Sequence, residues 1–434
     1  MSAPPPPDSS TPDPLTSGPS TDRIVADEGS ANWRRTLSIM IGLQIGMNAG
    51  FTVLAPIIPL FLPQIGVSDP AAVSLWAGVL GCVTSLFAAL MSPIWGRVAD
   101  RRGRRLMVLR SCLAIGAFIG LMSLVQNEWQ LLGLRAGMGI FAGFNAASIA
   151  MVATQVPARK LGYALGWLST GQLVGTLVGP LVGGAMADLT GSNRAPFVLT
   201  SVICFACAAV VLWLVQERFT PPKIAVGKTT FLQSFAVLGR APGLVPLFVV
   251  LLLAQFAVQA VQPVVTVFVE QLVRGEVGGE VGGASGNIAT LGGIAFSITG
   301  LADLIASPFL GRRSDTIGYR RVLLISLGGA ALASAPQFFV TSYWGFVAAR
   351  FGLGLFVGGI LPTANALVGR LAPAADRGAV YGATASAMFL GGSLGPLSGG
   401  AIAAVAGVRW VFLVVAVLLT INLVWVWLRV PEVK

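Results

Sequence analysis

Three charged residues lie inside long apolar stretches of this 434-residue chain: Asp303, Glu270 and Arg135. A carboxylate in an apolar setting holds its proton more tightly than one in water, so Asp303 could take up and release a proton near neutral pH. We therefore expect Asp303 to carry a coupling proton, with Glu270 as the second candidate. The alternatives for Asp303 are a fixed ion pair and a permanently neutral acid.

Arg135 stands near the start of an otherwise apolar stretch, and Arg350 repeats it 215 residues later. A charge is costly inside a membrane helix, so such a residue usually faces the protein interior and serves function. The alternative is a structural role, in which Arg135 binds a buried backbone carbonyl.

Polar side chains also recur at helical spacing in two of the stretches. One carries five at spacings of 4, 3, 4 and 4 residues, which places them within about 60° of one another on a helix: Gln255, Gln259, Gln262, Thr266 and Glu270. The other carries Gln44, Asn48 and Thr52, and Gln44 lies 215 residues before Gln259.

Two polar helix faces predict a central cavity, to which Phe51, Phe256, Asn145 and Ser148 would also contribute. Amides and aromatic rings with few charges suit amphipathic organic molecules. Interhelical hydrogen bonding without a cavity is the alternative.

Several classes of protein are excluded by what the sequence lacks. The absence of histidine removes His-based proton relays, HExxH zinc sites and Ser-His triads. Gly227-Lys228-Thr229 resembles the end of a phosphate-binding loop, but Pro222 stands where that motif needs glycine. Cys204 and Cys207 form a CxxC pair in an apolar stretch, where two small buried residues are the expectation. We expect no enzyme activity, no cofactor and no metal site.

The elements that position these residues are membrane helices. Hydrophobic residues make up 55% of the chain and charged residues only 10%. An apolar stretch of about 20 residues spans a bilayer as a helix. We identify twelve, at about 37–62, 73–95, 106–125, 129–154, 163–187, 195–215, 244–272, 288–310, 322–341, 343–371, 380–406 and 408–428.

The chain is a tandem repeat. SPIWGRVADRRGRR, from Ser92, returns 215 residues later as SPFLGRRSDTIGYR, with seven of fourteen positions identical. The prediction is an all-α membrane protein in which twelve transmembrane helices form two pseudo-symmetric six-helix bundles. Residues 33–215 and 244–434 form the bundles, 216–243 form a cytoplasmic linker, and 1–32 form a disordered tail rich in Pro, Ser, Asp and Thr.

The net charge of +11 follows the membrane topology rather than nucleic-acid binding. Of 28 Lys and Arg residues, 23 lie in tails and loops on one side, and only Arg194, Arg274 and Arg409 lie on the other. Positive charge marks the cytoplasmic side, so both termini are expected there, with the chain in a bacterial inner membrane as a monomer.

Two further motifs stand at the helix ends and on one helix face. The first is a basic turn expected to act as a cytoplasmic gating loop, with Gly96 allowing close helix approach and Asp100 facing an arginine or a helix N-terminus: Gly96, Asp100, Gly103, Arg104 and Arg105, repeated as Gly311, Asp315 and Gly318. The second is a row of small residues that could seal one end of the bundles or serve ordinary packing: Gly171, Gly175, Gly179, Pro180, Gly183 and Gly184.

Together these motifs resemble the major facilitator superfamily. The basic turn is similar to the superfamily's signature loop, and the glycine row is similar to the antiporter motif of its drug:proton exporters. Gly50, Pro56 and Pro59 match a pattern of its twelve-span exporters. The resemblance covers nearly all of the chain beyond residue 32, and it implies that Arg135 modulates proton exchange. The chain departs from many drug exporters because its first six spans hold no carboxylate.

The expected function is export of amphipathic drugs by proton antiport, through alternating access between the two halves. The alternative is a proton-coupled or facilitative uptake carrier for a single metabolite, which the same fold would support. The paired motifs disfavour a membrane sensor or scaffold.

Overall fold

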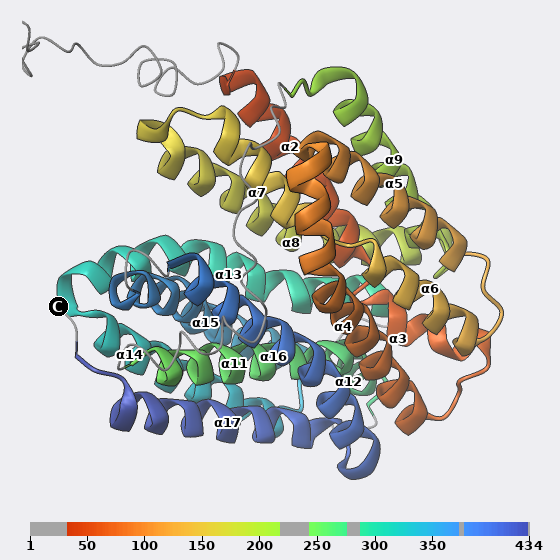
Figure 1. The fold of residues 1–434 in the computed structure, drawn as a ribbon. Coiled ribbons are helices and arrows are strands. Elements are labelled where there is room, and N and C mark those ends of the chain that lie inside the picture. Colours follow the sequence, from red (N-terminus) through yellow and green to blue (C-terminus); the bar gives the residue numbers. More distant parts are fainter. Residues whose placement is uncertain (1–32, 218–242, 276–286, 373–376, 433–434) are drawn as a thin grey trace, which may run out of the picture.

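The computed structural model describes residues 33–217, 243–275, 287–372 and 377–432, and within these ranges the regular structure is helical. Figure 1 shows two helical bundles, an N-terminal one coloured red to yellow-green and a C-terminal one coloured green to blue. The expected tail at 1–32 and nearly all of the expected linker at 216–243 lie outside the described residues, as does most of the glycine-rich segment that follows Arg274.

Twelve helical spans are long and apolar enough to cross a membrane. The N-terminal bundle consists of α2 (Trp33–Val53) with α3 (Ile57–Phe61) and the short 3-10 helix η1 (Leu62–Ile65), α4 (Pro70–Arg102), α5 (Arg104–Met122), α6 (Glu128–Ile140) with α7 (Phe144–Gln155), η2 (Ala158–Lys160), α8 (Leu161–Thr190) and α9 (Ala195–Leu214).

The C-terminal bundle repeats this order. It consists of α11 (Leu244–Ala260) with η3 (Gln262–Val264) and α12 (Val265–Val273), α13 (Ile288–Ile317), α14 (Tyr319–Ser334) with η4 (Ala335–Phe338), α15 (Tyr343–Leu371), α16 (Arg377–Ala406) and α17 (Val408–Arg429).

The helices α4 and α13 extend about two turns beyond their expected ends, into the basic turns. Each continues until a glycine with a positive φ, Gly103 at 91° and Gly318 at 97°. This conformation is readily available only to glycine, so these two residues end the helices. The basic turns are therefore short bends between long helices rather than loops.

Three spans that the sequence predicts as continuous are interrupted. The first breaks at a turn before Ile57, the fourth at Phe141–Gly143, and the seventh at η3. Pro56 and Pro263 lie at the first and third of these breaks. Proline has no backbone N–H and its ring clashes with the preceding turn, which explains why the helices break there.

The two halves meet through α8 against α13 and α4 against α16 (Figure 1). The closest approaches join Gly184 to Ala289, Gly293 to Pro180, Gly78 to Pro396 and Gly400 to Ser74. These positions lie where α4 and α13 begin and where α8 and α16 approach their ends. We call this region the contact end, and the opposite region, around the Gly103 and Gly318 turns, the basic end.

Candidate functional site

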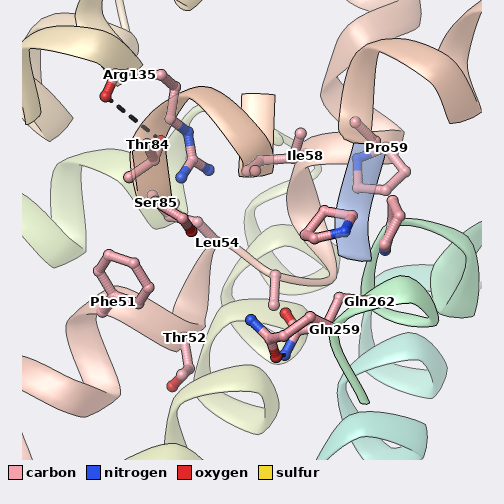
Figure 2. Close-up of a pocket in the computed structure, with 15 residues that line it drawn as sticks. Phe51, Thr52, Leu54, Ile58, Pro59, Thr84, Ser85, Arg135, Gln259 and Gln262 are labelled. Carbon is pink, nitrogen blue, oxygen red and sulfur yellow. Dashed lines mark hydrogen bonds between the residues drawn. The ribbon is translucent and has the colours of Figure 1, made fainter. Parts of the chain in front are cut away.

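A pocket of about 150 Å³ lies between the two halves, beside the contact end. The N-terminal half contributes side chains from the first, second and fourth spans, and the C-terminal half contributes side chains from the seventh and eleventh (Figure 2). The lining residues are Phe51, Thr52, Leu54, Ala55, Ile58, Pro59, Ala77, Gly81, Thr84, Ser85, Arg135, Gln259, Gln262, Pro263 and Pro396. Both broken spans contribute, because their bends at Ala55 and Pro263 widen the space between neighbouring helices.

The polar face of α2 contacts α7 through amide groups. Gln44 donates from Nε2 to Asn145 Oδ1 at 2.7 Å, and Asn48 donates from Nδ2 to the same oxygen at 3.4 Å. Gln44 is buried, whereas Asn145 is exposed. Ser148, one turn beyond Asn145, is fully buried and its hydroxyl has no partner within the described residues. Asn145 therefore faces open space while Ser148 packs inside the bundle.

The five-residue stripe expected on the seventh span divides at Pro263. Gln259 and Gln262 stay together, with Nε2 of Gln262 donating to Oε1 of Gln259 at 3.1 Å, and both line the pocket. Thr266 lies beyond the break, is fully buried, and packs near Gly292 of the α13 contact end. Gln255 and Phe256 pack beside Gly391 of α16. The regular helical rotation behind the expectation does not continue through η3.

The packing also corrects the expected pairing of Gln44 with Gln259. The Cβ positions of Gly175 and Gly179 of α8 lie against Asn48 and Thr52. Those of Gly391 and Gly395 of α16 lie against Gln255 and Gln259 in the same way. Thr52 and Gln259 are thus equivalent, at a separation of 207 residues, whereas Gly78 and Gly293 keep the separation of 215. The missing eight residues belong to the longer connection between Val273 and Ile288.

Arg135 points into the pocket from α6 (Figure 2). Its side chain is only 6% exposed, and Nε is buried without a hydrogen-bond partner. The neighbouring Thr84 hydroxyl contacts the backbone carbonyl of Arg135 at 3.4 Å, not the guanidinium. Arg350, its counterpart, donates from Nε to Ala295 O at 3.3 Å and lies over the ring of Phe296. The two equivalent arginines therefore have different surroundings.

Asp303 is half-buried on α13, where its carboxylate lies against Gly358 of α15. Within the described residues no ion pair or side-chain hydrogen bond involves Asp303, so the expected alternative of a fixed ion pair is not formed in this arrangement. Glu270, the second candidate, forms an ion pair with Arg274 at 2.5 Å near the contact end.

The glycine row on α8 packs directly on α2. A Cβ atom added at Gly175 would lie 2.5 Å from the carbonyl oxygen of Ile45, and one at Gly171 would lie 3.1 Å from that of Ile41. Gly179 and Gly183 continue the row against Ala49 and Val53. Pro180 and Gly184 instead face α13 of the other half. The motif thus joins helices within one bundle and also closes the contact end between the bundles.

The basic turns attach each second helix to the sixth helix of its own half. The carboxylate of Glu217 accepts hydrogen bonds from the backbone N–H groups of Arg104 at 2.9 Å and Arg105 at 2.8 Å. The Arg105 guanidinium donates to the carbonyl of Leu212 at 2.5 Å, and Arg320 donates to Trp427, the equivalent residue 215 positions later. Asp315 accepts from Tyr319. The side chain of Asp100 lies outside the described ones.

Gly96 differs from its expected role. Nothing lies within 4 Å of a Cβ atom added at Gly96 or at Gly311, so neither glycine permits a close helix contact here. The reason is that the halves touch at the contact end and not at the basic end, where these residues lie.

Two structural residues were missed by the sequence analysis. Arg110, counted among the loop charges, lies within α5, with its guanidinium 3.5 Å from the ring centroid of Trp95. Its Nη2 donates to the carbonyls of Phe141 and Ala142, which the break in the fourth span leaves without helical partners. Asp188, at the contact end of α8, accepts a 2.7 Å hydrogen bond from the backbone N–H of Thr290. Both partnerships join residues far apart in sequence, so no local signal marks them.

Comparison with known proteins agrees with this architecture. The sequence profile of the Major Facilitator Superfamily matches residues 40–292 and 281–434. The chain belongs to the major facilitator superfamily. Multidrug resistance protein MdtG of Proteus mirabilis is 36% identical over 405 residues, covering 93% of this chain and 98% of that protein. MdtG of Dickeya zeae is 37% identical over 402 residues, covering 93% and 96%.

A solved structure of the superfamily shares the same fold. The nucleoside transporter NupG superposes with a TM-score of 0.72 at 15% sequence identity, covering 91% of this chain and 99% of that one. As a member of the major facilitator superfamily, the chain is a multi-pass membrane transporter with twelve spans, related to bacterial multidrug-resistance proteins.

Proposed function

We propose that this transporter exports amphipathic organic compounds in exchange for protons, by alternating access between its two halves. The observation that carries the proposal is the pocket lined by side chains from both halves, in a chain 36% identical to multidrug resistance protein MdtG over 93% of its length. A site shared by two bundles changes its accessibility when the bundles rock against each other. The pocket is complete within one chain, so a monomer would suffice.

The packing at the two ends supports alternating access. At the contact end, glycine-to-backbone approaches and the Asp188–Thr290 hydrogen bond hold the halves together. At the basic end, Gly96 and Gly311 have open space beside them. In a second state, closure of the basic end would bring a helix against each of these glycines, and the contact end would separate.

The lining of the pocket supports an amphipathic cargo. Phe51, Leu54 and Ile58 offer apolar surface, while Gln259 and Gln262 offer amide donors and acceptors. The described pocket is below the range of about 300–1,000 Å³ that is usual for drug-sized ligands. It would hold one part of a larger cargo, or a small molecule as a whole.

Asp303 supports the proton exchange. Its carboxylate is half-buried, has no cationic partner within the described residues, and lies next to a glycine that leaves it room. Such an acid can change its protonation when its surroundings change between two states. Glu270 is less suited, because Arg274 already neutralises it.

The orientation proposed is the one that places the basic end in the cytoplasm, with both termini there. The cluster of arginines in the basic turns supports this, because positive residues are retained on the cytoplasmic side. In this orientation the described arrangement is closed toward the outside.

The experiment uses inverted membrane vesicles that contain the transporter and are acidified inside by respiration. Lipophilic cations, neutral drugs and organic anions are added in turn, and a pH-sensitive dye reports on proton movement. We expect proton release from the vesicles with at least one compound class, absent from vesicles without the protein. A lack of response to every class, together with metabolite uptake by whole cells, would favour the single-metabolite carrier instead.

A further inference from the structure

We propose that Arg135 forms an anion-binding subsite, so that the pocket selects compounds with a carboxylate, phosphonate or sulfonate group attached to a small apolar body. This inference rests on the proposed transport function and specifies its substrate class. It concerns the binding of charge, not the role in proton exchange that the superfamily resemblance implies for the same arginine.

The charge of the pocket is carried by one residue. Of the fifteen residues that line it in the described part of the chain, only Arg135 is ionisable under physiological conditions. Arginine stays protonated in proteins, so the pocket is positive at any relevant pH. A lipophilic cation would have to enter against this charge, and an anion would be attracted by it.

The guanidinium of Arg135 is unpaired within the described residues. No hydrogen bond or ion pair of its side chain is formed, and Nε is fully buried. Glu128, on the same helix, lies about 10 Å away along the helix axis, which is too far for an ion pair. A buried cation without a partner is costly, and an anionic ligand would supply the missing interactions.

The matched arginine in the other half shows that this is a specific feature. Arg350 is buried to the same extent, at 7% exposed, yet it donates to Ala295 O and lies over the Phe296 ring. It does not line the pocket. Burial of an arginine at this position of the repeat therefore does not require an unpaired guanidinium.

The groups around Arg135 fit a small organic anion. The planar guanidinium can donate two parallel hydrogen bonds to a carboxylate or phosphonate. The hydroxyl of Ser85 lines the pocket and has no partner within the described residues, so it can add a third donor. Figure 2 shows Gln259 and Gln262 across the pocket from Arg135, with Leu54 and Ile58 between them. The apolar body would lie against these two side chains and Phe51.

The experiment measures binding of three probes of similar shape to the purified, full-length transporter in nanodiscs of neutral lipid. The probes are phenylphosphonate, the neutral benzamide and the cationic benzyltrimethylammonium, and calorimetry gives their dissociation constants. Charged hydrogen bonds predict phenylphosphonate binding about ten- to hundredfold more tightly than benzamide. Equal binding of the two, or tighter binding of the cation, would overturn the proposal.

Three variants test the residue itself. Arg135→Gln is expected to remove the preference for phenylphosphonate, and Arg135→Lys to retain part of it because the charge remains while the planar fork is lost. The matched control, Arg350→Gln, is expected to leave the ratio unchanged in the monodisperse fraction. Loss of the preference in Arg350→Gln, or its persistence in Arg135→Gln, would contradict the assignment. Because binding needs no transport, tight binding without export would sink the proposed function and leave the subsite standing.

Discussion

At the scale of single residues, the buried charges of this transporter differ in what surrounds them. Arg110 satisfies backbone carbonyls at a helix break, and Arg350 satisfies one carbonyl and one ring. Arg135 and Asp303 have no such partners within the described residues. A buried charge left uncompensated costs several kcal/mol in a protein. Residues that bear this cost are the ones whose interactions change during function, which makes these two the residues to test.

Asp303 gives the first prediction. Asp303→Asn keeps the shape of the side chain but fixes it in a neutral form, so substrate-induced proton release from inverted vesicles is expected to be lost. Substrate affinity should stay within about threefold of the wild type, equivalent to less than 0.7 kcal/mol. The control Glu270→Gln removes an acid that is already paired with Arg274, and proton release should persist. Normal proton release in Asp303→Asn would exclude this carboxylate as the proton carrier.

Asp188 gives the second residue-scale prediction. Asp188→Ala removes the carboxylate that accepts the Thr290 N–H across the contact end, which should favour separation of the halves there. Spin labels at Leu124 and Phe339, both highly exposed and each in a different half, would report a longer distance distribution in the variant. Asp69→Ala is the matched control, because Asp69 caps its own helix by accepting from Ala72. An unchanged distribution in Asp188→Ala would show that this hydrogen bond does not hold the end closed.

At the scale of elements, the glycine row decides how closely α8 can approach α2. The backbones of the two helices meet because the facing residues on α8 have no side chain. The same arrangement recurs between α16 and α11. Each bundle thus has one helix pair packed backbone to backbone, and the far faces of those same glycine helices form the contact end.

This packing predicts a sharp difference between glycines on one helix. Gly175→Ala would place a Cβ atom 2.5 Å from the Ile45 carbonyl, so the helices must separate, and destabilisation by about 1–3 kcal/mol is expected. Gly166→Ala has no atom within 4 Å and should be neutral, or stabilising by up to about 1 kcal/mol. Thermal unfolding of the purified variants, followed by fluorescence, measures both. Equal unfolding temperatures would mean that the close approach is absent in the membrane.

At the scale of the whole molecule, the two halves are related by repetition but not by one uniform shift. The second and eighth spans keep a separation of 215 residues, while the first and seventh keep 207 in the packing. The pocket is therefore asymmetric, with Thr52 of one half standing where Gln259 stands in the other. An asymmetric pocket with a single arginine can orient an amphipathic cargo.

Topology gives the whole-molecule prediction. Single cysteines are placed at Arg102, in the basic end, and at Leu124, one span away, in a variant whose exposed Cys82 is replaced by serine. In intact cells a membrane-impermeant maleimide should label the Leu124→Cys protein and not the Arg102→Cys protein, because arginine-rich turns stay in the cytoplasm. Labelling of Arg102→Cys alone would reverse the orientation and make the described arrangement open to the outside.

The sequence by itself determined the class of the molecule. Twelve spans, the division into two related halves and the charged positions within the spans could all be predicted, because they depend on local hydrophobicity and on repeated motifs. The breaks in the first, fourth and seventh spans were not predicted, although Pro56 and Pro263 stood in the sequence, since proline inside a membrane helix is often accommodated without a break.

Only the tertiary structure decided which polar residues meet. The eight additional residues between Val273 and Ile288 shift the pairing of Gln255 and Gln259 with the first span, and no local pattern reveals how a connection absorbs such an insertion. The distinction between Arg135 and Arg350 depends on carbonyls and rings contributed by other helices. Contacts across a bundle depend on packing over long sequence separations, so they follow from the fold rather than from spacing along the chain.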